Sequence, residues 1–348
     1  MSEPLVLAID GGNSKTDLAL VRADGSVVAF VRGPLSSPHH LGLEGCVRVL
    51  TDLLDEACSQ GGLDRTGGPV AEVGELLLAG LDLPVEEETF GTLMRRRGWA
   101  KRTIVGNDTF AVLRAGTERG WGVAVVCGAG INCVGLAPDG RQARFAALGS
   151  ITGDWGGGFD VGLAALSAAA RSEDGRGPVT ALEQQVPAHF DLSRPLELAE
   201  ALHLKKIPMH RLTELSPIVL AQADHDPVSA MIVDRLAEEV VALSRVALAR
   251  LELTRRPVEV ILGGGLLRSG DRRLLAAIET GIHQIGPEIT ICVSEASPIV
   301  GAALLALDEL ETGPAEQARL RLELGEAARM YDQDRRSGSD SRNRSPSP

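Results

Sequence analysis

The chain has 348 residues, of which 40 are glycine, and 47 acidic against 35 basic residues give it a net charge of −12. An acidic surface repels nucleic acid and anionic membranes, so we expect neither as a partner. The five cysteines are irregularly spaced and form no C-x-x-C pair, which disfavours a disulfide framework, a zinc site and an iron–sulfur cluster. The length predicts about two domains. No signal peptide or membrane-spanning run is evident, so we expect a cytoplasmic protein.

A strand, a glycine loop and a second strand occur twice along the chain. The apolar run 5–9 predicts a buried strand, Asp10-Gly11-Gly12 follows it, residues 16–21 alternate as a strand, and 23–26 predict a hairpin turn. About 118 residues later the same order returns. Its parts are an apolar run at 123–127, a small-residue loop at 128–132, a strand at 133–137 and a Pro-Asp-Gly turn at 138–140. This internal repeat predicts two related domains.

The segments around the repeat alternate between helical and strand patterns, which predicts an α/β fold. Between the two copies we expect helices at 43–58 and 86–97 and strands at 75–79 and 103–105. After the second copy we expect helices at 161–171, 227–253 and 298–310, and a buried strand at 258–262 that ends in Gly263-Gly264-Gly265. The segment 331–348 contains no aliphatic residue and reads as a disordered tail.

The two glycine loops differ from the common nucleotide-binding motifs. The loop 10–16 lacks the G-x-x-x-x-G-K-[ST] spacing of a P-loop, and a strand pattern follows it instead of a helix. Gly128-x-Gly130 begins like a dinucleotide fingerprint, but Cys133 stands at the third position. A tight hairpin of small residues can still direct backbone N–H groups at an anion. An ordinary hairpin is the alternative for one such loop, but the repetition favours phosphate binding.

Six motifs in order carry a resemblance to a known family. They are DGGNSKT at 10–16, GNDT at 106–109, GAGIN at 128–132, the glycine-rich stretch 149–158, Gly263-Gly264-Gly265 and the small-residue helix 299–307. With these motifs the sequence resembles the BadF/BadG/BcrA/BcrD ATPase family, and within it the N-acetylglucosamine kinases, in the actin-like ATPase, sugar kinase and Hsp70 superfamily. Each motif alone is weak, and their order is what makes the resemblance specific.

The resemblance implies a fold and a division of the chain. We expect two ribonuclease-H-like α/β domains with an interdomain cleft, the first at 1–117 and the second at 118–298. Closing helices at 299–330 would pack back on the first domain, and 331–348 would be the disordered tail. A homodimer is the family expectation.

The resemblance also implies ATP and Mg²⁺ as cofactors. Asp10 would contact the magnesium ion, and the alternative is a turn residue that caps its own loop. Ser14, Lys15 and Thr16 offer side-chain donors to phosphate, although Lys15 is equally compatible with a solvated position. The expected nucleotide-binding residues are Gly11, Gly12, Asn13, Ser14, Lys15, Thr16, Gly128, Ala129, Gly130, Gly263, Gly264 and Gly265.

Asp108 matches the catalytic aspartate of these kinases. An aspartate at this position can orient and deprotonate a sugar hydroxyl. The alternative is an N-cap for the helix that begins at Thr109, and the two roles are compatible.

Sugar binding is expected mainly from the loop 149–158. The resemblance assigns Asp154 to ring hydroxyls, against the alternative of a flexible loop, and gives the expected sugar-binding set as Ser37, Asp108, Ile131, Asn132, Gly149 and Asp154.

Several residues depart from the family pattern around these positions. The usual Gly-Asp-Glu-Gly-Ser is changed at Trp155 and Gly157, and Trp155 fits either a sugar face or the core. Ala129 replaces a frequent threonine, and Ser37, before Pro38-His39, replaces a frequent asparagine.

Two further groups of polar residues have open roles. His39 and His40 are compatible with ordinary surface histidines. Asp82 lies at a strand end, where a turn role and a site role are both open.

The predicted function is ATP-dependent phosphorylation of an amino sugar, N-acetylglucosamine at its 6-hydroxyl. Glucosamine, N-acetylmuramic acid and glucose are alternative substrates. An ATPase that activates a radical dehydratase is disfavoured, because such activators carry cysteine ligands for a shared cluster. A regulatory nucleotide-binding protein is disfavoured by the acids at 10, 108 and 154.

Overall fold

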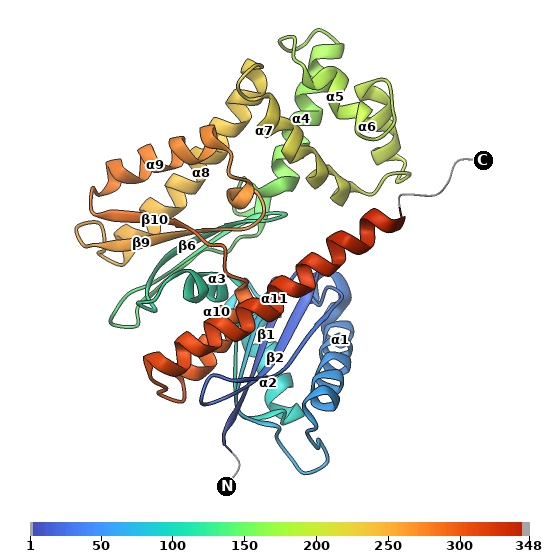
Figure 1. Ribbon diagram of the computed structural model, residues 1–348. Helices are drawn as coiled ribbons and strands as arrows, with labels where there is room; N and C mark the ends of the chain where they lie inside the picture. The colour runs from blue at the N-terminus through green and yellow to red at the C-terminus, as the bar shows by residue number, and fades with distance from the viewer. Residues whose placement is uncertain (1–2, 343–348) are drawn as a thin grey trace. The chain divides into compact units, whose positions relative to one another are not determined.

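The computed structural model describes residues 3–342, with side chains through 333 (Figure 1). The chain divides into two compact units. The first unit comprises the residues up to Gly120 and those from Ala296 onward, and the second comprises Trp121–Glu295. The corresponding boundaries expected from the sequence were 117/118 and 298/299.

The first unit is built on a mixed five-stranded sheet with the order β3-β2-β1-β4-β5. The first three strands form antiparallel pairs, and β1 pairs in parallel with β4, which pairs in parallel with β5. The strands are β1 (Leu5–Gly11), β2 (Thr16–Arg22), β3 (Val27–Gly33), β4 (Ala71–Leu78) and β5 (Ala100–Asn107).

Both faces of this sheet are buried, which explains why its strands read as continuous apolar runs. Leu7 and Ile9 of β1 face α1 (Pro38–Gly61) and α2 (Pro84–Arg97). The alternate residues Val6 and Ala8 face the opposite layer. That layer contains α3 (Thr109–Gly116), α10 (Pro298–Asp308) and α11 (Pro314–Arg342).

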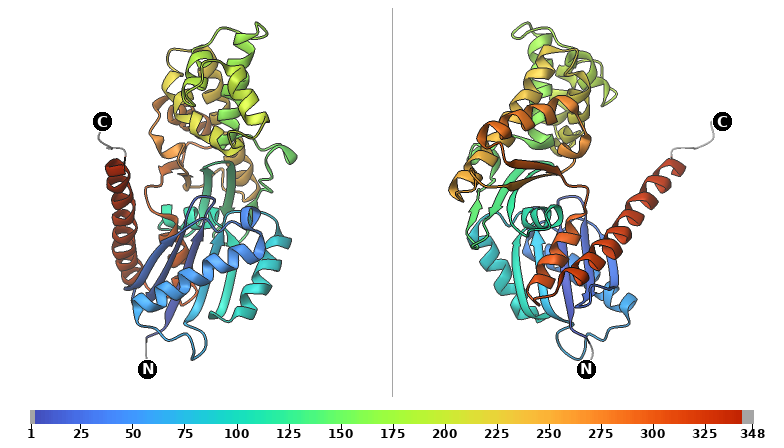
Figure 2. Two further views of the ribbon diagram at one scale, coloured as in Figure 1. Left: turned by 90° about the vertical axis from the view of Figure 1, so that its right-hand side faces the viewer. Right: turned by 60° about the vertical axis from the view of Figure 1, so that its left-hand side comes forward.

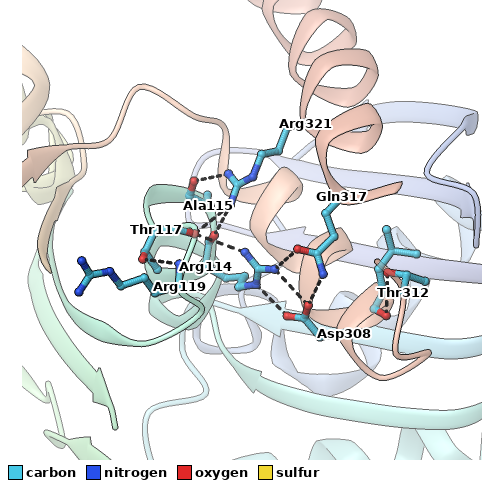
Figure 3. Close-up of polar contacts among 9 residues, drawn as sticks. Arg114, Ala115, Thr117, Arg119, Asp308, Thr312, Gln317 and Arg321 are labelled. Atoms are coloured by element: carbon cyan, nitrogen blue, oxygen red, sulfur yellow. Dashed lines mark hydrogen bonds and ion pairs between the residues drawn. The ribbon is translucent and has the colours of Figure 1, made fainter. Parts of the chain in front are cut away.

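A buried arginine joins the three helices of the second layer (Figure 3). Arg114 of α3 donates from Nε and Nη2 to the two carboxylate oxygens of Asp308, at 2.7 and 3.0 Å, and from Nη2 to Gln317 Oε1 at 2.8 Å. Arg321 of α11 donates to the carbonyls of Ala115 and Thr117 at the end of α3. The C-terminal helices are therefore fixed to the first sheet by directional polar contacts as well as apolar burial.

Helix α11 continues to Arg342, through part of the segment that was expected to be disordered. Tyr331 packs edge-to-face on Phe30, with ring centroids 5.5 Å apart, and Asp332 pairs with Arg32. Both views of Figure 2 show α11, in red, running beside the blue strands of the first sheet. These long-range contacts order part of a segment whose composition indicates disorder, and residues 343–348 lie outside the described residues.

The second unit repeats the same sheet. Its strand order is β10-β9-β6-β7-β8, with β6 antiparallel to β7, β7 antiparallel to β8, and β6, β9 and β10 parallel. The internal repeat predicted from the sequence is confirmed by this matching order. The strands are β6 (Gly122–Cys127), β7 (Ile131–Leu136), β8 (Gln142–Arg144), β9 (Val258–Gly263) and β10 (Ile289–Val293).

In the second unit, helices α4 to α8 lie between β8 and β9. Helix α8 begins at Pro227, where the Asp226 carboxylate accepts a hydrogen bond from Ser229 N–H, and it packs against α9 (Figure 1). The helices are α4 (Gly157–Glu173), α5 (Leu182–Ala188), α6 (Pro195–His203), α7 (Ser216–Gln222), α8 (Pro227–Arg250) and α9 (Arg272–Ile285). Among the described residues, no helix is long and apolar enough to cross a membrane.

Most of the elements predicted from the sequence are confirmed, with small shifts at their ends. Ile131 and Asn132 were expected in the second glycine loop, but both belong to β7. This loop is shorter than predicted because Ile131 pairs directly with Cys127. Strands β3, β8 and β10 and helices α6, α7 and α9 were not predicted.

Candidate functional site

The first hairpin places two carboxylates side by side. Asp10 is the next-to-last residue of β1, and Asp17 stands directly opposite it on β2. Asp17 is fully buried and is held by Arg32 of β3, whose Nη2 lies 2.9 Å from Asp17 Oδ2, and by Lys15, whose Nζ lies 2.9 Å from the same oxygen. Asp17 is thus a neutralised structural carboxylate, and it leaves Asp10 as the acid of the hairpin without an ion pair among the described residues.

The electrostatic surroundings of Asp10 favour a cation. Its carboxyl is only 9% exposed, and no hydrogen bond to it is present within the described part of the chain, so it does not cap its own loop. Burial first, and then the charges of Asp17 and Asp108, raise the pKa of Asp10 well above its usual range. A carboxylate oxygen is a ligand that Mg²⁺ prefers, and a dication would offset the repulsion. Asp10 therefore fits a magnesium contact.

The tip of the first hairpin is a tight turn. Gly12 N–H donates to Lys15 C=O at 2.8 Å, and Asn13 and Ser14 are exposed. The Thr16 hydroxyl instead points inward and lies 2.7 Å from both Pro34 C=O and Ser36 Oγ. Thr16 therefore supports the loop from inside, unlike the expected hydroxyl donor toward phosphate. The exposed groups at the tip are those that remain available to an anion.

Asp108 follows β5, which β4 separates from β1 in the sheet, and precedes α3. Its carboxylate makes no capping hydrogen bond, and the Oδ1 of Asn107 accepts from Thr109 N–H at 3.0 Å. Burial, and then the negative charge of Asp82, raise the pKa of Asp108 to about 7, against the opposing effect of backbone amides. A carboxylate with this pKa is ionised in a large fraction at neutral pH and is basic enough to accept a proton.

Asn107 connects Asp82 with the start of α3. Its buried amide donates from Nδ2 to Asp82 Oδ1 at 2.8 Å while its Oδ1 holds the amide of Thr109. Asp82 therefore lies close to Asp108, and the structure brings it into the candidate site. Sequence analysis had left a turn role and a site role open for Asp82.

A histidine and a glutamate lie next to Asp82. His39 Nε2 is 3.1 Å from Glu86 Oε1, and the other Glu86 oxygen accepts from the amides of Asp82 and Leu83. One ligand atom each from His39, Asp82 and Glu86 lies within 4.8 Å of the others. His39 is thus more than an isolated surface histidine.

Ser37 lies directly before α1. Its side chain is fully buried, and its Oγ has no hydrogen-bond partner among the described residues. A buried hydroxyl without a partner is uncommon and is typical of a position that a ligand or water completes.

The second hairpin makes close backbone contacts at its tip, whereas the first contains charged side chains. Gly128 N–H donates to Gly130 C=O at 2.9 Å, closing a turn of three small residues. The start of α4 is attached to it: Gly158 N–H donates to Gly128 C=O at 2.8 Å, and Phe159 N–H to Ala129 C=O at 2.9 Å. Gly157 has φ +74°, and a Cβ on it would lie 2.3 Å from Gly130 O. This close approach and the positive φ leave room only for glycine at this position.

The glycine triplet after β9 reaches the same hairpin. Gly264 has φ +88°, and a Cβ there would lie 2.1 Å from Cys127 O, whereas Gly265 faces open space. Leu266 N–H also donates to Cys127 C=O at 3.3 Å. Three glycine segments that are far apart in the sequence therefore converge within the second unit.

The segment 149–156 forms a compact turn before α4. Asp154 N–H donates to Gly149 C=O at 3.0 Å, and the Asp154 carboxylate accepts from the Thr152 hydroxyl. Asp154 is half-buried. The Asn132 Oδ1 accepts from Cys133 N–H at 2.7 Å, and Ile131 is a buried core residue. Trp155 packs at the edge of the core with Arg235 over its ring.

Comparison with known families decides the relationship of the chain. The model of the BadF/BadG/BcrA/BcrD ATPase family matches residues 7–306. The chain belongs to this family.

Individual relatives within and near the family are named as sugar kinases. The chain is 28% identical over 310 residues to an N-acetylmuramic acid/N-acetylglucosamine kinase of Clostridium acetobutylicum, covering 88% of this chain and 99% of the relative. It is 26% identical over 329 residues to an N-acetyl-D-glucosamine kinase of Dictyostelium discoideum, with the same coverages. A solved structure from Chromobacterium violaceum, provisionally named an N-acetylglucosamine kinase, matches with a TM-score of 0.70 and 23% identity, covering 88% of this chain and all of its own. The shared architecture confirms the α/β, actin-like fold class.

Membership in the BadF/BadG/BcrA/BcrD ATPase family does not assign roles to individual residues. The structure shows which of them lie close together. The first unit brings together Asp10, Asp108 and Asp82, as well as the first glycine loop. The second unit brings together its hairpin loop, the start of α4 and Gly263-Gly264-Gly265. Sequence reasoning missed Asp17, Arg32 and Asn107. A charge within an otherwise apolar strand, as at Asp17, was the signal that could have revealed the first of these.

Proposed function

We propose that the protein is an ATP-dependent kinase that phosphorylates an amino sugar, N-acetylglucosamine at its 6-hydroxyl. The observation that carries this proposal is Asp108, a carboxylate with a pKa of about 7 that sits at the head of α3 and does not cap it. The amino-sugar class is supported by two relatives whose names specify N-acetylglucosamine and whose lengths the chain covers almost completely.

Asp108 would orient the sugar hydroxyl and accept its proton as the oxygen attacks the γ-phosphorus. General-base assistance of this kind contributes about 10²–10⁴-fold to a rate. Asn107 would keep Asp108 in place through its contacts with Asp82 and the start of α3. The raised pKa serves the reaction, because a carboxylate with an ordinary pKa would be a much weaker base.

The glycine segments would receive the nucleotide. In the first unit, the exposed tip formed by Gly12, Asn13 and Ser14 offers donors to phosphate, and Lys15 adds positive charge despite its ion pair with Asp17. In the second unit, Gly128, Ala129 and Gly130 would receive phosphate, and Gly263, Gly264 and Gly265 the adenosine. These roles need backbone that a ligand can approach closely, which glycine provides.

Asp10 would hold Mg²⁺, directly or through water. The bound ion would neutralise charge on the transferring phosphoryl group. The structure supports this role because Asp10 is a buried carboxylate without a hydrogen bond from its own loop and with two other carboxylates near it.

The sugar would contact Asp154, Asn132 and the backbone of Gly149, with Ser37 completing its binding. The unpartnered hydroxyl of Ser37 supports this role. Serine is shorter than the asparagine expected from the family pattern, so the N-acetyl group would be held by fewer direct contacts. N-acetylmuramic acid is the second candidate substrate, because the Clostridium acetobutylicum relative carries that sugar in its name.

The experiment that tests the proposal is a panel of sugars incubated with ATP and Mg²⁺, with ADP release as the readout. We expect N-acetylglucosamine to stimulate ADP release most, and mass spectrometry or NMR of the product to place the phosphate on the 6-hydroxyl. Asp108→Asn should reduce kcat at least about 100-fold while ATP affinity changes little. Asp52→Asn, the same change at an exposed position of α1 in the first unit, is the matched control.

Three outcomes would contradict parts of the proposal. If no sugar stimulates ADP release, the kinase function is wrong. If glucose or glucosamine is preferred, the substrate class is wrong. If Asp108→Asn retains its full rate, another group is the base.

A further inference from the structure

The second unit contains a groove that none of the proposed roles uses. It lies between α4 and α8 and has a volume of about 670 Å³, within the size range of small-molecule sites. We name it the α4–α8 groove, and its lining includes Trp155, Leu163, Ala164, Arg171, Met231 and Arg235.

The middle of the groove is apolar and reachable from solvent. Leu163 is 41% exposed and Met231 70% exposed, although both are large apolar side chains. Ala164 and Ala168 are partly buried and pack on the core, and their short side chains leave the space open. A groove with this lining would gain free energy by burying an apolar body of matching size.

The lining of the groove includes two arginines and one carboxylate, namely Arg235, Arg171 and Asp160. The guanidinium of Arg235 lies 4.0 Å from the centre of the Trp155 ring, and within the described part of the chain it makes no hydrogen bond or ion pair. Arg171 donates only to the carbonyl of Arg176, at 2.9 Å. The nearby Asp160 carboxylate accepts from Gly156 N–H at the start of α4. The carboxylates of Asp174 and Glu239 act electrostatically on Arg171 and Arg235, but within the described part of the chain neither forms an ion pair with these arginines.

The stacked pair gives the positive charge a fixed position. A guanidinium over an aromatic face is attracted by the ring and loses side-chain freedom, while its N–H groups at the edge stay available to acceptors. Arg235 is thereby pre-organised to receive an anion beside an apolar surface.

We propose that the α4–α8 groove binds an amphipathic organic anion, a molecule with an aromatic or aliphatic body and one carboxylate, sulfonate or phosphate group. The apolar body would lie against Leu163, Met231 and the two alanines, and Arg235 would receive the anionic group. This site is separate from the residues proposed for phosphoryl transfer. An occupant would nevertheless touch Trp155, which follows Asp154, and α4, whose first amides hold Gly128 and Ala129.

The proposal is tested by fluorescence titration of the full-length protein with 8-anilinonaphthalene-1-sulfonate, without ATP or sugar. We expect saturable binding at one probe per chain. The uncharged N-phenyl-1-naphthylamine should bind at least ten-fold more weakly, and inorganic sulfate alone should compete poorly. Because no turnover is measured, failure here is distinguishable from failure of the proposed kinase function.

Two variants locate the binding. Arg235→Gln should weaken binding of the sulfonate at least ten-fold and remove most of its advantage over the uncharged probe. Arg245→Gln removes the same charge from an exposed position of α8 outside the groove and should leave both affinities unchanged. Circular dichroism should be the same for both variants.

Certain results would overturn the proposal. Equal sulfonate binding by wild type and Arg235→Gln would place the probe elsewhere. Equal affinity for the charged and uncharged probes would show that Arg235 does not recognise the anionic group. Sedimentation of the protein at increasing concentration would show whether it self-associates. If probe binding is lost as the protein self-associates, the groove receives a second copy of the chain and not a small anion.

Discussion

The two hairpins of the repeat have the same strand pairing and opposite chemistry. In the first, Asp10 stands opposite Asp17. In the second, Cys127 ends β6 and stands opposite Ile131. The same difference continues in the adjoining parallel strands, where Ala8 pairs with Glu75 and Val125 pairs with Leu262. The first copy thus contains buried carboxylates at positions where the second contains apolar or thiol side chains.

This difference teaches how one backbone design supports two tasks. The first hairpin has the acid suited to a metal ion, stabilised in its position by the paired Asp17 and Arg32. The second hairpin serves as a close-packed backbone platform, which Gly157 and Gly264 approach within contact distance. A substitution in one copy can therefore be compared with a substitution in the other copy, or at a neighbouring residue.

The largest effect is expected at the paired loop positions. Asp10→Asn should lower kcat about 1,000-fold, equal to about 4 kcal/mol, because the proposed magnesium contact loses its charge. Cys127→Ala, at the end of β6 in the second hairpin, should change kcat only a few-fold. Steady-state kinetics across a range of Mg²⁺ concentrations make the comparison, and a similar loss in both variants would show that the loops act through structure alone.

The buried carboxyl of β4 should make the first unit sensitive to pH. Burial, and to a lesser degree Glu309, raise the pKa of Glu75 to about 8 from 4.5. As pH rises from 4.5 to 8, the unfolded carboxyl ionises while the folded one stays protonated, so the free energy of unfolding falls. Glu75→Gln should be about as stable as wild type near pH 4.5 and more stable by about 4 kcal/mol at pH 8.

The control for this change is Glu72→Gln on the same strand. Glu72 is exposed and pairs with Lys101 at the surface, so its replacement should alter stability by less than about 1 kcal/mol at either pH. Denaturant unfolding at the two pH values supplies the measurement. A stability of Glu75→Gln that follows the wild type at every pH would mean that Glu75 ionises normally in the fold.

Two adjacent glycines test the platform role of the second hairpin. Gly264→Ala adds a Cβ to a residue with φ +88° and 2.1 Å from Cys127 O, so we expect a loss of about 2 kcal/mol in stability and weaker nucleotide binding. Gly265→Ala faces open space without a positive φ and should cost less than about 0.5 kcal/mol. Thermal unfolding and nucleotide titration measure both, and equal effects would contradict the close-approach argument.

The repeat and the fold class were predictable from the sequence because they depend on local patterns. An apolar run, a small-residue loop and an alternating run are visible in any short window, and their recurrence predicts a second copy. Strand β3 and helix α9 escaped notice, although β3 directly follows the predicted turn at 23–26. The end of α11 was misjudged because Tyr331 and Asp332 are ordered by Phe30 and Arg32, some 300 residues away in the chain.

The candidate site was only partly predictable for the same reason. Asp10, Asp108 and Asp154 follow from motifs that the family resemblance supplies. Arg32 holding Asp17, and Asn107 joining Asp82, depend on the register and order of neighbouring strands, which no single window contains. The inward hydroxyl of Thr16 depends on Pro34 and Ser36 in the same way. Motifs thus predict which residues carry reactive or ligand-binding groups. Tertiary hydrogen bonds and ion pairs decide which of these groups are already held by other residues.

The smallest predicted effect is a shift in a pH profile, and it tests whether the carboxylates of the first unit act together. The base must be ionised to act, so kcat/KM should rise with pH and level off above about 7, the pKa of Asp108. The negative charge of Asp82 contributes to that pKa, so Asp82→Asn should move the rising limb to lower pH by about one unit or less. Asn at position 82 retains an acceptor for Asn107 Nδ2, so the geometry should be preserved. A loss of rate at all pH values without a shift would mean that Asp82 acts only by positioning Asn107, whereas a shift with an unchanged plateau would show that the first unit tunes its base through charge.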